Sequence, residues 1–323
     1  MILSEPVGIP MLRAASVLKR LALLPRSLKL KFAQSGPIPP SGMRLAYIGD
    51  GESFSYIRDT FAKGRLELLP DTIPITRIAE MIRKLPQSGT WLCVEIDRLL
   101  LPFLPGKGNL TFPWLRQRIH LDSVEYRRRR RKIEDNFGRK VRRYQYQFRL
   151  VHDAESLAHF YECLYLPHVS ARFGSECHAR TLEELRKAVA KGFLLQVLRN
   201  NRWIAGVVCS VRRDEVSARA FGHLPEEEYS LRLGALSAAY YGLLEYAQEH
   251  SFASVDLLRS RPDSRDGVYC HKQRWGAVAM KDCWPHTAIR FYPPEGMPVP
   301  ESFAGLLVWD GQAFREMRKT GNP

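Results

Sequence analysis

Residues 193–223 read FLLQVLRNNRWIAGVVCSVRRDEVSARAFGH, and this stretch decides the class of fold. Three aliphatic runs are separated by the pair Asn200-Asn201 and by the polar residues 212–215. An asparagine pair between two such runs favours a tight hairpin turn, because asparagine tolerates left-handed backbone angles. We therefore predict three consecutive antiparallel strands, at 193–199, 203–211 and 216–222.

Helices flank these strands in the sequence. Leu236, Tyr240, Leu243, Leu244 and Ala247 recur at the spacing of one buried helix face. Further elements are predicted as an amphipathic helix at 153–166, a helix opened by the capping box 181–184, strands at 254–258 and 287–292, and a short helix at 268–276. The order indicates an α/β (α+β) protein with a mixed, mostly antiparallel sheet flanked by helices.

The N-terminal half has its own strands and helices. Strands are expected at 44–48 and 90–96, and helices at 53–61 and 75–85. The turn at 49–51 lacks the third glycine of a phosphate-binding fingerprint, so an ordinary strand-to-helix turn is favoured. The predicted domains are a basic amphipathic N-terminal arm and loop (1–42), a mixed α/β lobe (43–121), a basic inter-lobe helix (122–147), a C-terminal domain (148–292) and a C-terminal extension (293–323).

The chain is strongly basic. It has 49 Lys and Arg against 34 Asp and Glu, a formal charge of +15 over 323 residues. Such an excess concentrates anions at the surface, and nucleic acid, anionic lipid, an acidic carrier protein and a nucleotide cofactor all remain open as partners. The six cysteines form no CxxC pair and several lie in apolar runs, which favours a reducing, cytoplasmic location.

Two basic segments are candidates for surface binding. No apolar run reaches the roughly 18 residues that span a bilayer, and residues 11–32 are predicted as a basic amphipathic arm. This arm either packs on the protein itself or lies at the inner membrane surface. The second segment holds six consecutive bases at 127–132, and is either a solvated inter-lobe helix or a polyanion site such as tRNA would use. Its predicted binding residues are Arg127, Arg128, Arg131 and Lys132.

Four segments of the C-terminal half resemble a known family. They are RWIAGVVCSV (202–211), LRLGALSAAYYGLLEYAQEH (231–250), SVDLLRSRP (254–262) and GVYCHKQRWGA (267–277). Together they are similar to the C-terminal domain of the Fem-like branch of the GNAT acyltransferase superfamily. This branch includes proteins associated with exopolysaccharide and cellulose synthesis, and peptidyltransferases that take amino acids from tRNA. The resemblance covers roughly 148–292, and implies that the first lobe is a degenerate second GNAT-like unit.

The resemblance implies a GNAT-type N-acyltransferase. It would move an acyl group from acyl-CoA, or an equivalent thioester, to an amine of a small-molecule or envelope-precursor acceptor. A helix N-terminus would hold the donor's phosphates, because its first amides are unpaired and its dipole is positive there. The donor-binding residues implied are Arg232, Leu233, Gly234 and Ala235, with Val207 and Val208 from a preceding strand. Two alternatives stay open: a tRNA-dependent aminoacyl transferase of Fem type, and a non-catalytic polyanion-binding protein with a degenerate GNAT fold.

Residues 271–276 (HKQRWG) match a family motif that implies Lys272 as a positive group near the reacting carbonyl. His271 stands where the family has an aromatic residue, and imidazole can act as a base near neutral pH. The other predicted catalytic residues are Tyr269, Asp256 and His223. The alternative interpretation pairs Lys272 with Asp256 and packs His271 as a ring. We expect no metal, since Cys177-His178 and Cys270-His271 lack a second ligand pair at metal spacing.

Overall fold

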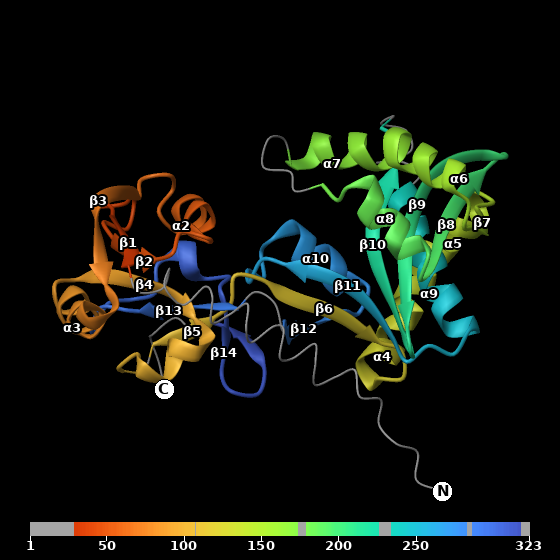
Figure 1. Ribbon diagram of the computed structural model, residues 1–323. Coiled ribbons are helices and arrows are strands. Elements are labelled where there is room, and N and C mark those ends of the chain that lie inside the picture. Colours follow the sequence, from red (N-terminus) through yellow and green to blue (C-terminus); the bar gives the residue numbers. More distant parts are fainter. Residues whose placement is uncertain (1–28, 107, 174–178, 226–233, 283–285, 318–323) are drawn as a thin grey trace, which may run out of the picture. The chain divides into compact units, whose positions relative to one another are not determined.

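A computed structural model describes residues 29–106, 108–173, 179–225, 234–282 and 286–317 (Figure 1). Contacts between residues divide the chain into two compact units. Unit 1 comprises residues 1–115, 261–266 and 281–323, and unit 2 comprises residues 116–260 and 267–280. Among the described residues, no helix combines the length and the apolar character needed to cross a membrane.

Unit 2 is built on a seven-stranded sheet of order β12-β6-β11-β10-β9-β8-β7. The strands are β6 (Leu115–His120), β7 (Gln147–Val151), β8 (Gly192–Arg199), β9 (Arg202–Arg212), β10 (Glu215–His223), β11 (Ser254–Ser260) and β12 (Val278–Lys281). Strands β7 to β10 pair antiparallel in succession, whereas β10 and β11 pair parallel. The mixed, mostly antiparallel sheet predicted from the sequence is confirmed.

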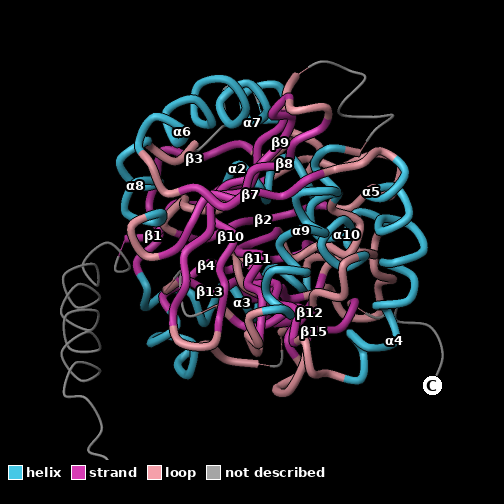
Figure 2. Tube along the Cα trace, turned by 90° about the vertical axis from the view of Figure 1, so that its right-hand side faces the viewer, coloured by secondary structure: helices cyan, strands magenta, loops and turns pink. Residues whose placement is uncertain are grey.

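Helices cover both faces of this sheet. They are α4 (Val124–Ile133), α5 (Arg139–Arg143), α6 (Ala154–His159), α7 (Leu166–Phe173), α8 (Leu182–Val189), α9 (Ala235–Glu249) and α10 (Gly267–Arg274), with π-helical turns at Glu134–Gly138 and Phe160–Tyr165. Helices α6 to α8 lie on one side of β8, β9 and β10, and α9 lies on the other (Figures 1 and 2). Each face therefore has its own apolar core, as the alternation of side chains along a strand requires.

Local sequence signals in unit 2 act as predicted. Thr181 caps α8 and exchanges hydrogen bonds with Glu184 in a full capping box. Asn200 and Asn201 have φ angles of 50° and 59°, so both adopt the left-handed conformation that a tight β8–β9 hairpin needs.

Unit 1 contains a six-stranded sheet of order β3-β1-β2-β4-β13-β5. Its strands are β1 (Lys29–Gln34), β2 (Arg44–Gly49), β3 (Glu67–Pro74), β4 (Thr90–Asp97), β5 (Asn109–Thr111) and β13 (Thr287–Tyr292). Helices α2 (Phe54–Phe61) and α3 (Ile78–Gln87), 3-10 turns at Ile75–Arg77, Arg98–Phe103 and Glu301–Phe303, and the hairpin β14 (Leu307–Trp309) with β15 (Phe314–Glu316) complete it. Unit 1 is also mixed α/β, with β2 and β4 parallel.

The division of the chain differs from the predicted boundaries at 42, 121, 147 and 292. Strand β1, within the predicted arm 1–42, pairs with β2 in the sheet of unit 1, and residues 1–28 of that arm lie outside the described residues. Residues 116–147 belong to unit 2, while β13, expected within 148–292, hydrogen-bonds antiparallel to β4 in unit 1. Every residue of β4 is buried, so this strand needs a partner on each edge, and β2 and β13 supply them. The short strand β5 lies in the stretch 101–113, which is rich in proline and glycine.

Candidate functional site

The parallel strands β10 and β11 separate soon after they begin. They pair at only three positions, Glu215 with Ser254, Val216 with Val255 and Ser217 with Asp256. Strand β10 nevertheless continues to His223 and stays paired with β9 throughout. Beyond Ser217 and Asp256, the facing edges of β10 and β11 therefore carry backbone groups that the other strand does not satisfy.

Each strand is irregular where the separation begins. The β9–β10 register shifts between Ala218 and Ala220, which makes Arg219 the extra residue of a β-bulge. Leu258 in β11 has φ 62°, a left-handed conformation that costs a leucine about 1–2 kcal/mol. Its amide donates to Asp256 Oδ1 at 2.9 Å, which holds the kink. Local strain of this kind is common at functional sites.

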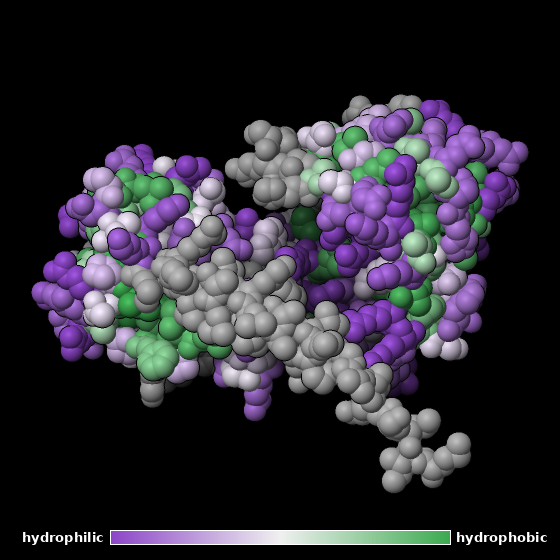
Figure 3. All heavy atoms as spheres, in the orientation of Figure 1, coloured by the Kyte–Doolittle hydropathy of each residue, from purple (hydrophilic) through white to green (hydrophobic). Residues whose placement is uncertain are grey.

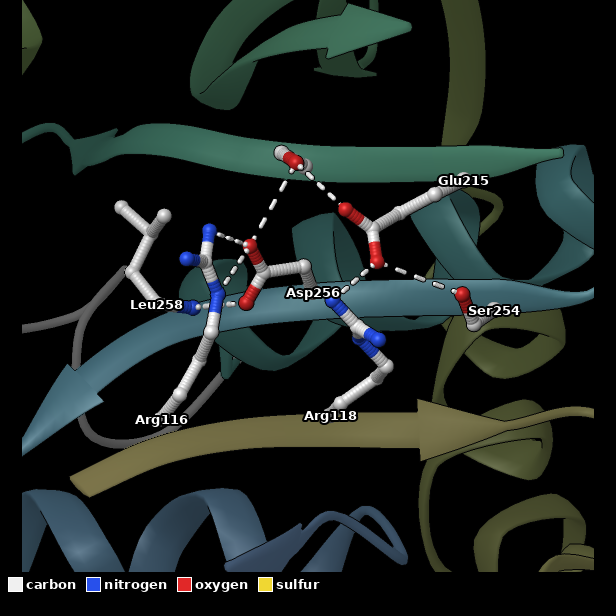
Figure 4. Close-up of polar contacts among 7 residues, drawn as sticks. Arg116, Arg118, Glu215, Ser254, Asp256 and Leu258 are labelled. Carbon is white, nitrogen blue, oxygen red and sulfur yellow. Dashed lines mark hydrogen bonds and ion pairs between the residues drawn. The ribbon is translucent and has the colours of Figure 1, made fainter. Parts of the chain in front are cut away.

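Asp256 is the centre of a polar cluster at this point (Figure 4). Its side chain is fully buried and its Oδ2 accepts from the guanidinium of Arg116 on β6, with the Nε bond at 2.9 Å, and from Ser217 Oγ at 3.4 Å. Buried carboxyl groups normally have charged and hydrogen-bonding partners of this kind. Asp256, predicted as a catalytic residue, is thus engaged in joining β6, β10 and β11, and we interpret it as a positioning residue.

A second ion pair lies beside the first. Arg118 on β6 contacts Glu215 Oε2 at 2.6 Å, and Glu215 also accepts from Ser254 Oγ at 3.4 Å (Figure 4). Arg116 and Arg118 are two residues apart in a strand, so both project from the same face of the sheet. Neither arginine was predicted as a site residue; the alternation of LRQRIH at 115–120 was the available signal.

Helix α10 carries the predicted Lys272 and Tyr269. Lys272 is 6% exposed, and its Nζ donates to the carbonyl of Arg259 at 2.6 Å. The alternative interpretation, an ion pair of Lys272 with Asp256, is wrong. The Asp256 carboxylate pairs with Arg116, and Lys272 bonds to the Arg259 carbonyl. Tyr269 is also buried, and its carbonyl accepts from Gln117 Nε2 at 3.2 Å. The structure therefore places Lys272 at the end of β11.

The two histidines predicted as bases differ in geometry. Trp275 Nε1 donates to His271 Nε2 at 3.3 Å, and since an indole can only donate, this nitrogen of His271 carries no proton and is occupied. His223 Nδ1 lies 2.6 Å from the carbonyl of Leu224, an acceptor, so Nδ1 carries the proton and the neutral ring keeps Nε2 as its basic nitrogen. Of the two, His223 has the arrangement a base needs.

Helix α9 begins with amides that no side chain caps within the described residues. Its N-cap residue Gly234 has φ 67°, and the cap position makes no side-chain hydrogen bond. The first amides of a helix have no partner within the helix, and together with the helix dipole they attract anions. Ala235 is fully buried, and the predicted Arg232 and Leu233 lie outside the described residues.

Val207 and Val208, predicted to bind the donor, lie in the two apolar cores of unit 2. Both are fully buried in β9, with Val207 packed on the α9 side and Val208 on the side of α6 to α8. Strand β9 borders β10 on the edge opposite to β11, so it does not form the separation described above. The sequence signal for these two valines was the apolar run of a central strand.

The basic segment is helical, as predicted, and consists of α4, a π-helical turn and α5. Several of its arginines are ion-paired, among them Arg129 with Glu125 at 2.9 Å and Arg139 with Asp135 at 2.7 Å. The four predicted binding residues differ from these paired arginines, because all four are exposed and make no ion pair within the described part of the chain. They are Arg127, Arg128, Arg131 and Lys132. The surface over α4 is hydrophilic (Figure 3).

Unit 1 contains a group of carboxylates where β2 and β4 end. Oxygens of Asp50, Glu52 and Glu95 lie within 4.8 Å of one another. Glu95 is fully buried, and its Oε2 accepts from the Tyr47 hydroxyl and from the Ser53 amide. Burial, followed by the charge of Asp50, raises the pKa of Glu95 to about 7. A partly protonated Glu95 allows these carboxylates to lie together.

Comparisons with known proteins give only distant similarities. No family model and no curated sequence matches the chain. Among solved structures, L-PGS from Bacillus licheniformis has a TM-score of 0.40 and 13% identity, covering 92% of this chain and 95% of that chain. FemX has a TM-score of 0.40 and 11% identity, covering 79% and 82%. A GCN5-related N-acetyltransferase from Kribbella flavida has a TM-score of 0.29 and 15% identity, covering 90% and 98%. Similarity at this level does not bear on the activity of this protein.

Proposed function

We propose that unit 2 is an N-acyltransferase domain that takes its acyl group from a thioester such as acyl-CoA. The observation that carries the proposal is the separation of β10 and β11 after three pairs. An extended chain with amide groups can bind an unpaired strand edge through backbone hydrogen bonds, as an added strand does. The pantetheine arm of a thioester donor has this chemistry, and the resemblance of residues 148–292 to GNAT domains implies the same use.

The start of α9 would hold the phosphates of the donor. Gly234 is the N-cap of a helix of 15 residues, and among the described residues no side chain bonds to the first amides of this helix. Phosphate groups bind helix N-termini through these amides and through the positive end of the dipole. A nucleotide-linked thioester would therefore have its phosphates at α9 and its acyl group between β10 and β11.

The reaction would be attack of an amine nitrogen on the thioester carbonyl. The new C–N bond forms as the C–S bond breaks, the thiolate leaves and is protonated, and the amine loses one proton. His223 Nε2 is our candidate for receiving that proton, either directly or through a water molecule. The carbonyl oxygen becomes negative in the transition state, and Lys272 or an amide of the bulge at Arg219 would stabilise it.

Calorimetric titration with acetyl-CoA, succinyl-CoA and a long-chain acyl-CoA tests the donor. We expect Ser237→Glu to weaken binding about tenfold or more, because it places a carboxylate in the first turn of α9, where phosphate would bind. A glutamate there favours the helix, so folding should not suffer. Gln248→Glu, at the other end of α9, is the control and should bind as the wild type does.

Three outcomes would contradict all or part of this proposal. If none of the three thioesters binds while an aminoacyl-tRNA or an acyl carrier protein does, coenzyme A is not the donor. If no donor of any kind binds, the acyltransferase proposal is wrong. Equal affinity of Ser237→Glu and wild type would remove α9 from the donor site.

Polyanion binding is a second candidate function, favoured by the exposed bases of α4. Arg127, Arg128, Arg131 and Lys132 have no acidic partner among the described residues, unlike the arginines nearby. Bases left unpaired on one exposed helix are available to the phosphates of a nucleic acid. If that nucleic acid is tRNA, it would also carry an aminoacyl donor.

Salt dependence separates this function from a merely solvated helix. We expect Arg128→Ala with Arg131→Ala to reduce the log–log salt slope of tRNA binding by about 1.4–1.8, since each phosphate contributes about 0.7–0.9. Arg139→Ala with Arg142→Ala removes the same charge from ion-paired positions and should reduce the slope less. Equal slopes for the two double variants, or binding that does not depend on salt, would reject the polyanion site.

A further inference from the structure

Arg219 is placed unusually for an arginine. It is the extra residue of the β10 bulge, next to the point where β10 and β11 separate. Its side chain is half-buried and, within the described residues, has neither a hydrogen bond nor an ion pair. Buried arginines are normally paired, because an unpaired charge away from water is costly. Among the described residues, this position therefore lacks a negative group to pair with.

The charged residues described around Arg219 do not supply that group, because each carboxylate among them is paired with another arginine. Arg116 pairs with Asp256, and Arg118 pairs with Glu215 at 2.6 Å. Arg180 precedes α8; its Nε donates to the carbonyl of Arg219 at 3.0 Å and its NH1 lies 3.9 Å from Glu184. Each of these three arginines has a carboxylate, and within the described part of the chain Arg219 is left as one excess positive charge.

The electrostatic environment of Arg219 agrees with this count. Burial lowers the pKa of its guanidinium, the neighbouring Arg180 lowers it further, Asp256 acts in the opposite direction and Arg116 adds to the lowering. An arginine still stays protonated at neutral pH. A protein that keeps such a charge half-buried loses stability, and a bound anion would restore it.

We propose that Arg219, with Arg180 beside it, binds a carboxylate or phosphate group of the acceptor. This inference rests on the proposed function, because it takes the bound anion to be part of the acyl acceptor. The guanidinium of Arg219 offers the planar pair of N–H donors that fits either oxyanion. Because Arg219 lies at the separation of β10 and β11, an acceptor held there by its acidic group would present its amine to the acyl group between the strands.

Titration with inorganic phosphate and with succinate tests the anion site. All proteins in this test carry Ser237→Glu, so that the start of α9 does not bind the probes. We expect Arg219→Met to weaken binding of the better probe about tenfold or more, and Arg219→Lys to retain part of it. Arg213→Ala removes an equal charge from the exposed β9–β10 turn and should leave affinity unchanged.

The two probes also identify the chemistry. Tighter phosphate binding indicates a phosphorylated acceptor, and tighter succinate binding indicates a carboxylate. The melting temperature of Arg219→Met should equal or exceed that of its parent, because the substitution removes an unpaired half-buried charge. Affinity of Arg219→Met within twofold of its parent for both probes would overturn the inference.

Coenzyme A titration of Arg219→Met, without Ser237→Glu, separates this inference from the proposed function. If the thioester binds and anion affinity does not depend on Arg219, the inference fails while the acyltransferase proposal stands. If anion affinity depends on Arg219 but no donor binds, the anion site stands and the acyltransferase proposal fails.

Discussion

Replacing Lys272 by alanine is expected to slow acyl transfer about a hundredfold to a thousandfold, while donor affinity changes little. A group that stabilises the developing oxyanion acts in the transition state, so its loss appears in the rate constant and in the specificity constant alike. The buried ammonium at the end of β11 is suited to this, because a charge there is poorly screened by water. Single-turnover kinetics with the donor identified by titration give the rate.

The competing role for Lys272 is structural, and the same samples distinguish it. Its bond to the carbonyl of Arg259 ties α10 to β11, and losing one such bond costs on the order of 1 kcal/mol. A variant with a lowered melting temperature and a wild-type rate would make Lys272 a structural residue and leave His223 as the candidate to pursue. Lys272→Arg should rescue the rate only in part, because a planar fork differs from a compact ammonium. Arg274→Ala, an exposed base on the same helix, is the matched control.

Elements with local signals were predictable from the sequence. The capping box at Thr181 and the hairpin at Asn200-Asn201 depend on residues within a few positions of each other, and both form as expected. The buried face of α9 follows from helical spacing alone, which Leu243 and Ala247 illustrate. Information carried over four or five residues is sufficient for such elements.

Features formed over long separations were not predictable. Arg116 and Asp256 are 140 residues apart in the sequence, and no local pattern around either residue predicts their ion pair. Strand β13, which is almost 200 positions later in the sequence, pairs with β4, because the backbone groups on both edges of a fully buried strand need hydrogen-bond partners. The same holds for Arg219, whose lack of an acidic partner among the described residues is visible only once the carboxylates of its neighbours are assigned.

The lysine and histidine predictions illustrate a third case. The prediction that Lys272 and His271 lie on a helix is confirmed. Their position on a helix does not, however, predict which hydrogen bonds their side chains make. His271 Nε2 is occupied by Trp275 four residues later, a spacing at which helix side chains meet. The basic nitrogen of His223 instead depends on the carbonyl of the next residue, Leu224, at the end of β10.

Glu95 is expected to make the stability of the protein fall as pH rises. Its pKa is about 7 in the folded protein, raised from the ordinary value of 4.5 chiefly by burial. Below pH 4.5 both folded and unfolded forms hold the proton, so the contribution of this group is fully present. Between about pH 4.5 and 7 the unfolded chain releases the proton and the folded chain retains it, so stability is lost across this window. The loss is on the order of 3 kcal/mol, from about 1.4 kcal/mol per pKa unit.

Glu95→Gln should remove this dependence. Glutamine keeps an oxygen for the Tyr47 hydroxyl and the Ser53 amide, and its amide can donate towards Asp50, much as the protonated carboxyl does. Urea unfolding at pH 5, 6, 7 and 8 should show the variant and the wild type converging at acid pH, with the variant more stable at pH 8. Glu67→Gln, an exposed position in β3, should keep the wild-type slope. Parallel pH profiles of wild type and Glu95→Gln would mean that Glu95 is ionised in the folded protein throughout this range, and that a positive group, not a proton, balances the three carboxylates.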